Sequence, residues 1–117
     1  MIMPKEKLFS PQKPALKWTM HVKGKMRFYG LSESRVKRVI AHPERAEAGI
    51  APKTTAVMQS ITKKGKTTKE IWVMYQDKKT QRTIITAWRY PGKSPVRETI
   101  PIPGNIRDEL QREGYLT

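Results

Sequence analysis

Hydrophobic residues recur at helical spacing in the segment that follows the first prolines. From Trp18 to Tyr29, large apolar side chains at Trp18, Val22, Met26 and Tyr29 fall within one sector of a helix with 3.6 residues per turn. Gly30 comes next, and a glycine just past the last periodic residue is typical of a helix end. The pattern predicts a first helix with one buried stripe.

A second helix is predicted directly after this glycine. Ser32 is a favourable N-cap, and Leu31 and Val36 have the spacing of a hydrophobic staple, which fixes the angle at which the chain enters a helix. Pro43 restricts the residue before it, so the helix should end there. The apolar stripe of this helix consists of Val36, Val39 and Ile40.

The pattern changes to strands after a loop over residues 46–53. Residues 54–62, 68–76 and 81–90 are rich in apolar and β-branched residues and are separated by the short polar turns KKGK and DKKT. Such spacing predicts an antiparallel meander. The second and third strands carry apolar residues on both faces, so one face should pack on the helices. The other should be covered by the tail or form a binding surface.

These elements predict an α+β fold, in which two N-terminal helices pack on a three- to four-stranded antiparallel sheet and a further helix follows at the C-terminus. Residues 1–16 contain three prolines among lysines and are expected to be a loose basic arm. Residues 17–90 hold the domain. Residues 91–117 are a proline-rich linker and a final helix, which Asn105 should cap and Gly114 should end.

Charge adds the first indication of function. Lys and Arg number 24 against 10 Asp and Glu, which gives a net charge of +14. Residues 1–45 hold 11 cations and 3 anions, residues 46–90 hold 9 and 3, and residues 91–117 hold 4 of each. Such a field attracts polyanions, namely nucleic acid as the first candidate, an acidic membrane surface or an acidic protein, and the simpler alternative is a surface kept soluble by excess lysine.

Other function classes find little support in the sequence. The chain has no cysteine, which excludes disulfides and thiolate chemistry and fits a cytoplasmic location. No run of about 18 apolar residues is present, so no membrane partner is expected. The two histidines lie 21 residues apart, no pair of carboxylates has a suitable spacing, and no glycine-rich phosphate loop occurs. We therefore expect neither a metal nor a cofactor.

Cleavage of RNA without a metal needs a base, an acid and a cation near the phosphate. His21 and Lys25, one helical turn apart, are the candidate catalytic residues. The candidate nucleic-acid contacts are Arg27, Arg35, Arg38, His42, Arg82, Trp88, Arg89 and Tyr90. Each has a simpler alternative: a hydrogen-bonded structural histidine, a charge at a helix end, a solvated arginine row, or core aromatics.

The stretch HVKGKMRFYGLSESRVKRVIAHPE, followed by KEIWVMYQ and TIITAWRY, resembles a small uncharacterised prokaryotic and phage domain family related in fold to the RelE/ParE and BrnT toxins. The matching positions are His21, Met26, Gly30, Ser32, Val36, Val39 and Ile40. Lys25 and Tyr29 depart, since arginine is usual at both positions. If those arginines act chemically, the change would affect activity, because lysine does not reproduce the bidentate fork of arginine.

The resemblance implies a RelE-like domain whose open sheet face meets RNA or the ribosome, or is blocked by a small acidic antitoxin-like protein. It leaves two functions open. One is a metal-independent endoribonuclease toxin in which His21 acts as base or acid. The other is a non-catalytic protein that binds RNA, DNA or an acidic partner and whose histidine is structural.

Overall fold

The computed structural model describes residues 14–96 and 99–116. They form one sheet of five strands and three helices. The strands are β1 (Ala15–Trp18), β2 (Arg45–Ala48), β3 (Thr54–Lys63), β4 (Lys66–Lys78) and β5 (Gln81–Pro91). The helices are α2 (Met20–Tyr29), α3 (Glu33–Ala41) and α4 (Gly104–Arg112). The strand order is β1-β5-β4-β3-β2. The expected α+β class is confirmed.

The sheet is larger than predicted, and it is mixed. The meander β3–β4–β5 is antiparallel, as expected, and β2 extends it at one edge. At the other edge β1 runs parallel to β5, from Ala15 beside Gln81 to Trp18 beside Ile84. Both additional strands have four residues, which is the shortest length at which alternation can indicate a strand, and neither was predicted.

The beginning of the domain therefore differs from the prediction. Trp18 belongs to β1 and not to the first helix, which begins at Met20 because the Thr19 hydroxyl caps it by accepting a hydrogen bond from the Val22 amide at 3.0 Å. The strand also takes up the end of the predicted loose arm. Residues 1–13 of that arm lie outside the described residues.

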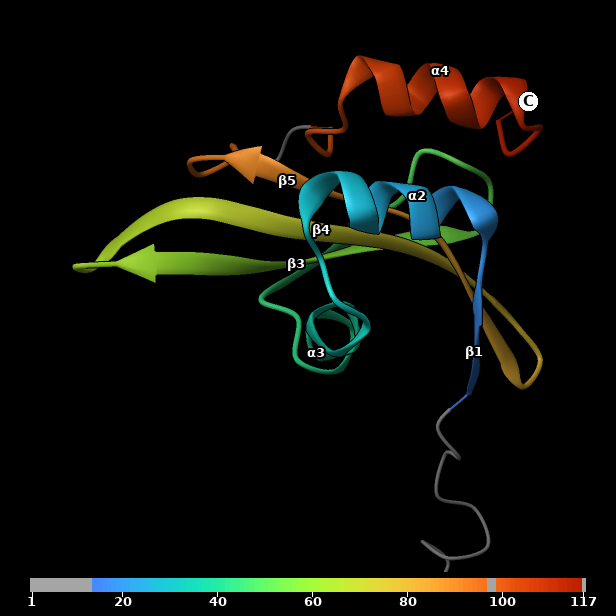
Figure 1. Cartoon of the computed structure of the whole chain (residues 1–117), viewed down its shortest axis with the longest axis horizontal. Helices are drawn as coiled ribbons and strands as arrows, with labels where there is room; N and C mark the ends of the chain where they lie inside the picture. The colour runs from blue at the N-terminus through green and yellow to red at the C-terminus, as the bar shows by residue number, and fades with distance from the viewer. Residues whose placement is uncertain (1–13, 97–98, 117) are drawn as a thin grey trace, which may run out of the picture.

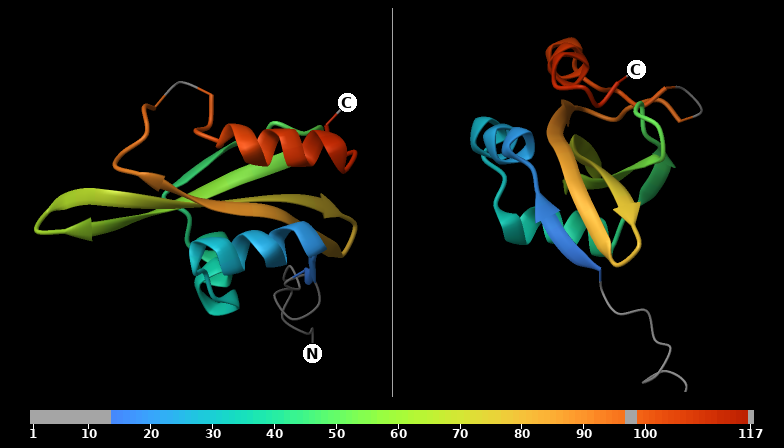
Figure 2. Two further views of the ribbon diagram at one scale, coloured as in Figure 1. Left: turned by 45° about the horizontal axis from the view of Figure 1, so that its top comes forward. Right: turned by 90° about the vertical axis from the view of Figure 1, so that its right-hand side faces the viewer.

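Two apolar layers enclose the sheet. Helices α2 and α3 cover one face, where Val22, Val36 and Val39 pack against strand residues such as Ile71 and Val73. Helix α4 covers the opposite face (Figures 1 and 2). There its two buried residues, Ile106 and Leu110, join a cluster around Trp72 and Trp88, whose rings stack with centroids 5.9 Å apart. Of the two alternatives that the sequence left open for the second face, coverage by the tail is the one observed.

The helix ends follow the sequence closely, with one exception. Gly30 adopts a left-handed conformation with φ 67° and ends α2, and Ser32 caps α3 by accepting from the Arg35 amide. Asn105 is not a cap, because α4 already begins at Gly104, after Pro103. Gly114, with φ 84°, ends α4 in a Schellman arrangement, in which the Tyr115 amide donates to the Leu110 carbonyl.

Strands β3 and β4 continue well beyond the helices as a projecting hairpin (Figure 1). Its turn consists of Lys64 and Gly65, with φ values of 52° and 76°. Positive φ at both central residues defines the tight two-residue turn that matches the twist of antiparallel strands. We call residues 61–69 the hairpin tip.

Candidate nucleic-acid interface

His21 lies at the start of α2 and is almost entirely enclosed, with 4% of its side chain exposed. Its Nδ1 is 2.9 Å from Glu113 Oε2, and its Nε2 is 2.9 Å from Thr86 Oγ1 on β5. Since a carboxylate only accepts, Nδ1 carries a proton, and in the neutral ring Nε2 accepts from the threonine hydroxyl. Both ring nitrogens are thus occupied within the protein.

The carboxylate, imidazole and hydroxyl of Glu113, His21 and Thr86 follow one another in the order of a nucleophilic triad. The hydroxyl, however, belongs to a threonine with no exposed surface. A nucleophile must lie within reach of its substrate. The arrangement therefore links β5, α2 and the end of α4, and it has the contacts of a structural histidine.

Lys25, the second candidate catalytic residue, lies one turn further along α2 and pairs with Glu109 of α4. Two links therefore join the helices, between His21 and Glu113 and between Lys25 and Glu109. On each helix the two residues are four positions apart, and they are matched in antiparallel order. We call these four residues the α2–α4 clasp. Glu109 and Glu113 were not recognised in the sequence, although their spacing repeats that of His21 and Lys25.

Tyr29, at the other position where the resemblance expects arginine, does not supply the missing cation. Burial, followed by the nearby Glu109 carboxylate, raises the pKa of its phenol above the ordinary value of 10.0. The group therefore stays neutral at physiological pH and cannot act as a base there. Tyr29 itself therefore does not replace the arginine.

The three candidate residues at the end of β5 make contacts within the protein. Trp88 is fully buried against Trp72, so its ring faces are not free to stack with a base, contrary to the sequence-based hypothesis. Tyr90 is partly buried against the same cluster. Arg89 donates through Nε to the Tyr29 carbonyl at 2.7 Å and through Nη2 to the Gly30 carbonyl, which satisfies the end of α2.

Arg82 is also occupied, at the opposite end of β5. It forms a bidentate pair with Asp77 at 2.6 and 3.0 Å and lies over the Tyr75 ring. The hydrogen bond to Asp77 raises the pKa of the guanidinium above its ordinary value, so it remains charged. Because its positive charge is matched by a carboxylate, Arg82 is a weak candidate for phosphate.

The α3 candidates are more accessible. Arg38 and His42 are exposed, and their backbone carbonyls accept hydrogen bonds from the Gln59 side chain on β3, at 3.2 and 2.9 Å. This contact places the end of α3 beside the base of the hairpin tip. Arg35 is half-buried on the same helix.

Within the described residues, the densest group of exposed lysines lies on the hairpin tip, where the sequence predicted the turn KKGK and assigned it no function. Its four lysines are exposed, and this stretch contains no acidic residue. They are Lys63, Lys64, Lys66 and Lys69. Glu70, which follows directly, is turned inward, where its carboxylate accepts from the Trp72 indole and from Ser94. Glu44 borders the base of the hairpin and accepts from the Ser60 amide.

A second surface feature lies at the end of α2. Phe28 is 73% exposed, although it is a large aromatic residue, and its neighbour Arg27 is exposed as well. The ring meets Tyr29 edge-on with centroids 4.8 Å apart, and the Lys25 ammonium lies 5.6 Å from its centre. The sequence placed Arg27 among the candidate contacts but gave Phe28 no role.

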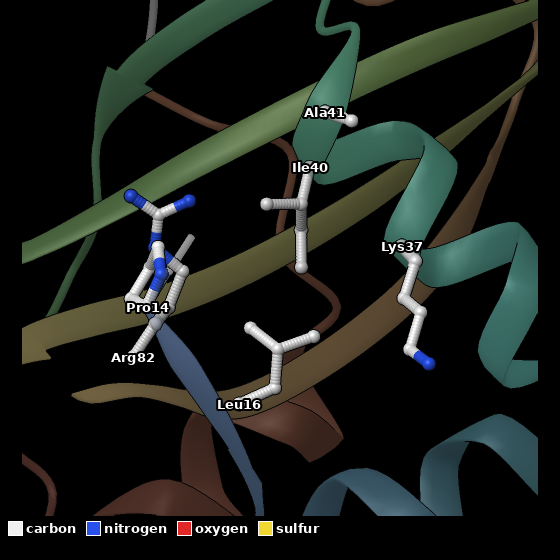
Figure 3. Close-up of a pocket in the computed structure, with 6 residues that line it drawn as sticks. All are labelled: Pro14, Leu16, Lys37, Ile40, Ala41 and Arg82. Carbon is white, nitrogen blue, oxygen red and sulfur yellow. The ribbon is translucent and has the colours of Figure 1, made fainter. Parts of the chain in front are cut away.

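A hollow of about 660 Å³ lies between α3 and the β1 edge (Figure 3). Leu16 and Ile40 form its apolar floor, while Lys37 and Arg82 stand at its margin. An apolar floor offers no donors to a phosphate. We therefore locate the candidate interface on the hairpin tip and the end of α2.

Comparisons with known proteins do not extend this picture: no family model, curated protein or solved structure matches the chain. Within the described residues, no three His, Asp or Glu side chains gather in a way that could hold a metal ion. No helix among those residues is long and apolar enough to cross a membrane.

Proposed function

We propose that this protein is a nucleic-acid-binding module, with RNA as the first candidate ligand, and that the hairpin tip is its principal phosphate contact. The observation that carries the proposal is the projecting hairpin, with four exposed lysines and no acidic residue among residues 61–69. Lysine ammonium groups on an accessible projection can approach the phosphates of a polynucleotide and displace its counterions.

The lysines of the hairpin tip lower the stability of the folded protein, which supports a functional role for them. Lys63 and Lys66 are direct cross-strand partners, and like charges in that position repel. Lys64 occupies a left-handed conformation that glycine or asparagine adopts more readily, at a cost of roughly 1–2 kcal/mol. A bound polyanion would relieve the repulsion.

Among the two functions that the sequence left open, the contacts of His21 favour the non-catalytic one. A general base or acid must lie within hydrogen-bond reach of its substrate. His21 has both nitrogens occupied and 4% of its side chain exposed, and Lys25 is paired with Glu109. An endoribonuclease would require the α2–α4 clasp to open.

A RelE/BrnT-like origin remains part of the proposal. Two helices followed by an antiparallel meander, β3–β4–β5, are compatible with it. The open sheet face that the resemblance implies is not observed, because α4 covers the face opposite α2 and α3. Binding through a projecting hairpin requires no open face, which is why we place the ligand there.

Two variants of equal charge test the proposal. The hairpin variant replaces Lys63, Lys64, Lys66 and Lys69 with glutamine. The far-end variant replaces Lys17, Lys53, Lys78 and Lys79, which are also exposed but lie at the opposite end of the strands. Binding of a labelled single-stranded RNA of about 12 nucleotides, a site size typical of small binding folds, is measured by fluorescence anisotropy.

The hairpin variant should bind at least about tenfold more weakly than the wild type, and the far-end variant should lose less than about threefold, since contacts and not net charge govern the affinity. Equal losses would mean that the protein attracts RNA only through its overall charge. A wild type that binds no nucleic acid at low salt would overturn the proposal.

A further inference from the structure

The exposed ring of Phe28 is not explained by the fold. Among the described residues, only Met20, Phe28 and Val96 are large, apolar and exposed, and the other large apolar side chains there are buried or partly buried. Phe28 makes no contribution to either core cluster. An exposed aromatic residue with cations beside it is a common means of holding an unpaired base.

The surroundings of Phe28 provide the charges that such a ligand needs. Arg27 and Lys23 are exposed on the same helix. Arg89, which donates to the Tyr29 and Gly30 carbonyls, lies directly below the helix end. Arg89 is already bonded to the helix end, so Arg27, which is exposed next to Phe28, is the cation that can hold the phosphate of a base resting on the ring.

The end of α2 is also continuous with the hairpin tip. Arg89 pairs across the sheet with Ile71 of β4. Two residues earlier on β4 is Lys69, which alternation places on the same side as Ile71 and whose partner is Ile61 of β3. Through its bonds to the Tyr29 and Gly30 carbonyls, Arg89 connects the end of α2 that carries Phe28 to the side of β4 on which Lys69 lies.

We infer that Phe28 is a base-stacking residue and that the ligand of this surface is a single-stranded stretch of nucleic acid. This inference rests on the proposed function. The lysines of the hairpin tip hold the backbone, which any strand possesses, whereas Phe28 requires a base whose face is free. In a duplex that face is already stacked on its neighbours, so the ring contributes only to binding of a single strand.

Three substitutions distinguish stacking from simple apolar contact. Phe28→Leu keeps apolar surface but removes the aromatic face, and Phe28→Trp keeps an aromatic face. Met20→Ala is the matched control, because Met20 is 80% exposed at the other end of the same helix. The probes are single-stranded RNA, single-stranded DNA and blunt duplexes, each of about 12 nucleotides per strand. Thermal melting checks that each variant is folded.

Phe28→Leu should weaken binding of the preferred single strand by about tenfold, while Phe28→Trp stays within about threefold of the wild type. Met20→Ala should change nothing, and Phe28→Leu should bind the duplex as the wild type does. The RNA and DNA single strands show which polymer supplies the base.

The inference would be overturned if Phe28→Leu bound the single strand like the wild type, if Phe28→Trp lost as much as Phe28→Leu, or if the duplex lost as much as the single strand. In each of these cases, weaker RNA binding by the hairpin variant would still support the proposed function. Absence of all binding by the wild type would instead remove the proposed function itself.

Discussion

At the scale of single residues, His21 shows how the same side chain can suggest catalysis in the sequence and structure in the fold. The spacing of His21 and Lys25 was recognised from the sequence, but their partners, Glu109 and Glu113, are 84 and 92 positions away from them. Nothing in a helical pattern indicates which distant helix will pack beside it. The sequence therefore indicated that His21 and Lys25 lie close together, but it did not indicate that both pair with glutamates in or directly after α4.

His21→Ala should lower the thermal melting temperature by several degrees. It leaves the buried Thr86 hydroxyl without its partner and removes the link to Glu113, a loss of about 1–3 kcal/mol. His42→Ala is the control, because His42 is exposed and should change stability by less than about 0.5 kcal/mol. Melting is followed by circular dichroism, and RNA cleavage is assayed on the same samples.

An unchanged melting temperature for His21→Ala would contradict the structural role. Cleavage of RNA by the wild type that disappears in His21→Ala but persists in His42→Ala would restore the endoribonuclease hypothesis. We expect no such histidine-dependent cleavage.

At the scale of elements, the turns between strands share one feature, which is a lysine in the left-handed conformation. The non-glycine residues with positive φ in the described part of the chain are all lysines, namely Lys53, Lys64 and Lys79. Each lies at an exposed turn, where asparagine would adopt the same conformation at lower cost. Substitutions in these turns can therefore separate two effects of the lysine, namely the loss of stability caused by its conformation and the gain in affinity caused by its charge.

Lys64→Asn should stabilise the protein by roughly 0.5–1 kcal/mol and at the same time weaken RNA binding by a few fold. Lys79→Asn, in the turn at the other end of β4, should stabilise to a similar extent and leave binding within about twofold. Urea denaturation gives the stabilities, and anisotropy gives the affinities. If both substitutions weakened binding equally, the hairpin tip would have no special role.

Helix α4 stabilises the sheet by packing on the face opposite α2 and α3. Leu110→Ala should cost about 2–5 kcal/mol, because this fully buried side chain packs in the cluster around Trp72 and Trp88. Gln111→Ala, an exposed neighbour on the same helix, should change stability by less than about 0.5 kcal/mol. Tryptophan fluorescence during urea denaturation measures both. A Leu110→Ala variant as stable as the wild type would mean that α4 does not pack there.

The elements that the sequence predicted are those with long or well-punctuated patterns. The meander, α3 with its Ser32 cap, and the glycine ends at Gly30 and Gly114 all follow local chemistry. The strands β1 and β2 were missed because four residues hold too little periodicity, and the pairing of β1 with β5 joins residues far apart in the chain. The exposure of Phe28 was hidden because it lies next to the buried stripe of a short helix.

At the scale of the whole molecule, charge and shape lead to the same surface. The cations lie mainly in residues 1–90, and the neutral C-terminal segment forms α4 on the far face of the sheet. Two of the arginines predicted to contact nucleic acid, Arg82 and Arg89, are already bonded to other groups of the protein. Among the described residues, the closest group of exposed lysines projects on the hairpin tip. The central claim is therefore that a small group of lysines, and not the total charge of +14, binds the polyanion.

The dependence of RNA affinity on salt concentration tests this claim most directly. The logarithm of the binding constant falls linearly with the logarithm of the salt concentration, with a slope of about 0.7 per contacted phosphate of a single strand. The hairpin variant should reduce the magnitude of this slope by about 2 to 3, and the far-end variant, which loses the same charge, by less than about 1. Equal slopes for the two variants would contradict the account.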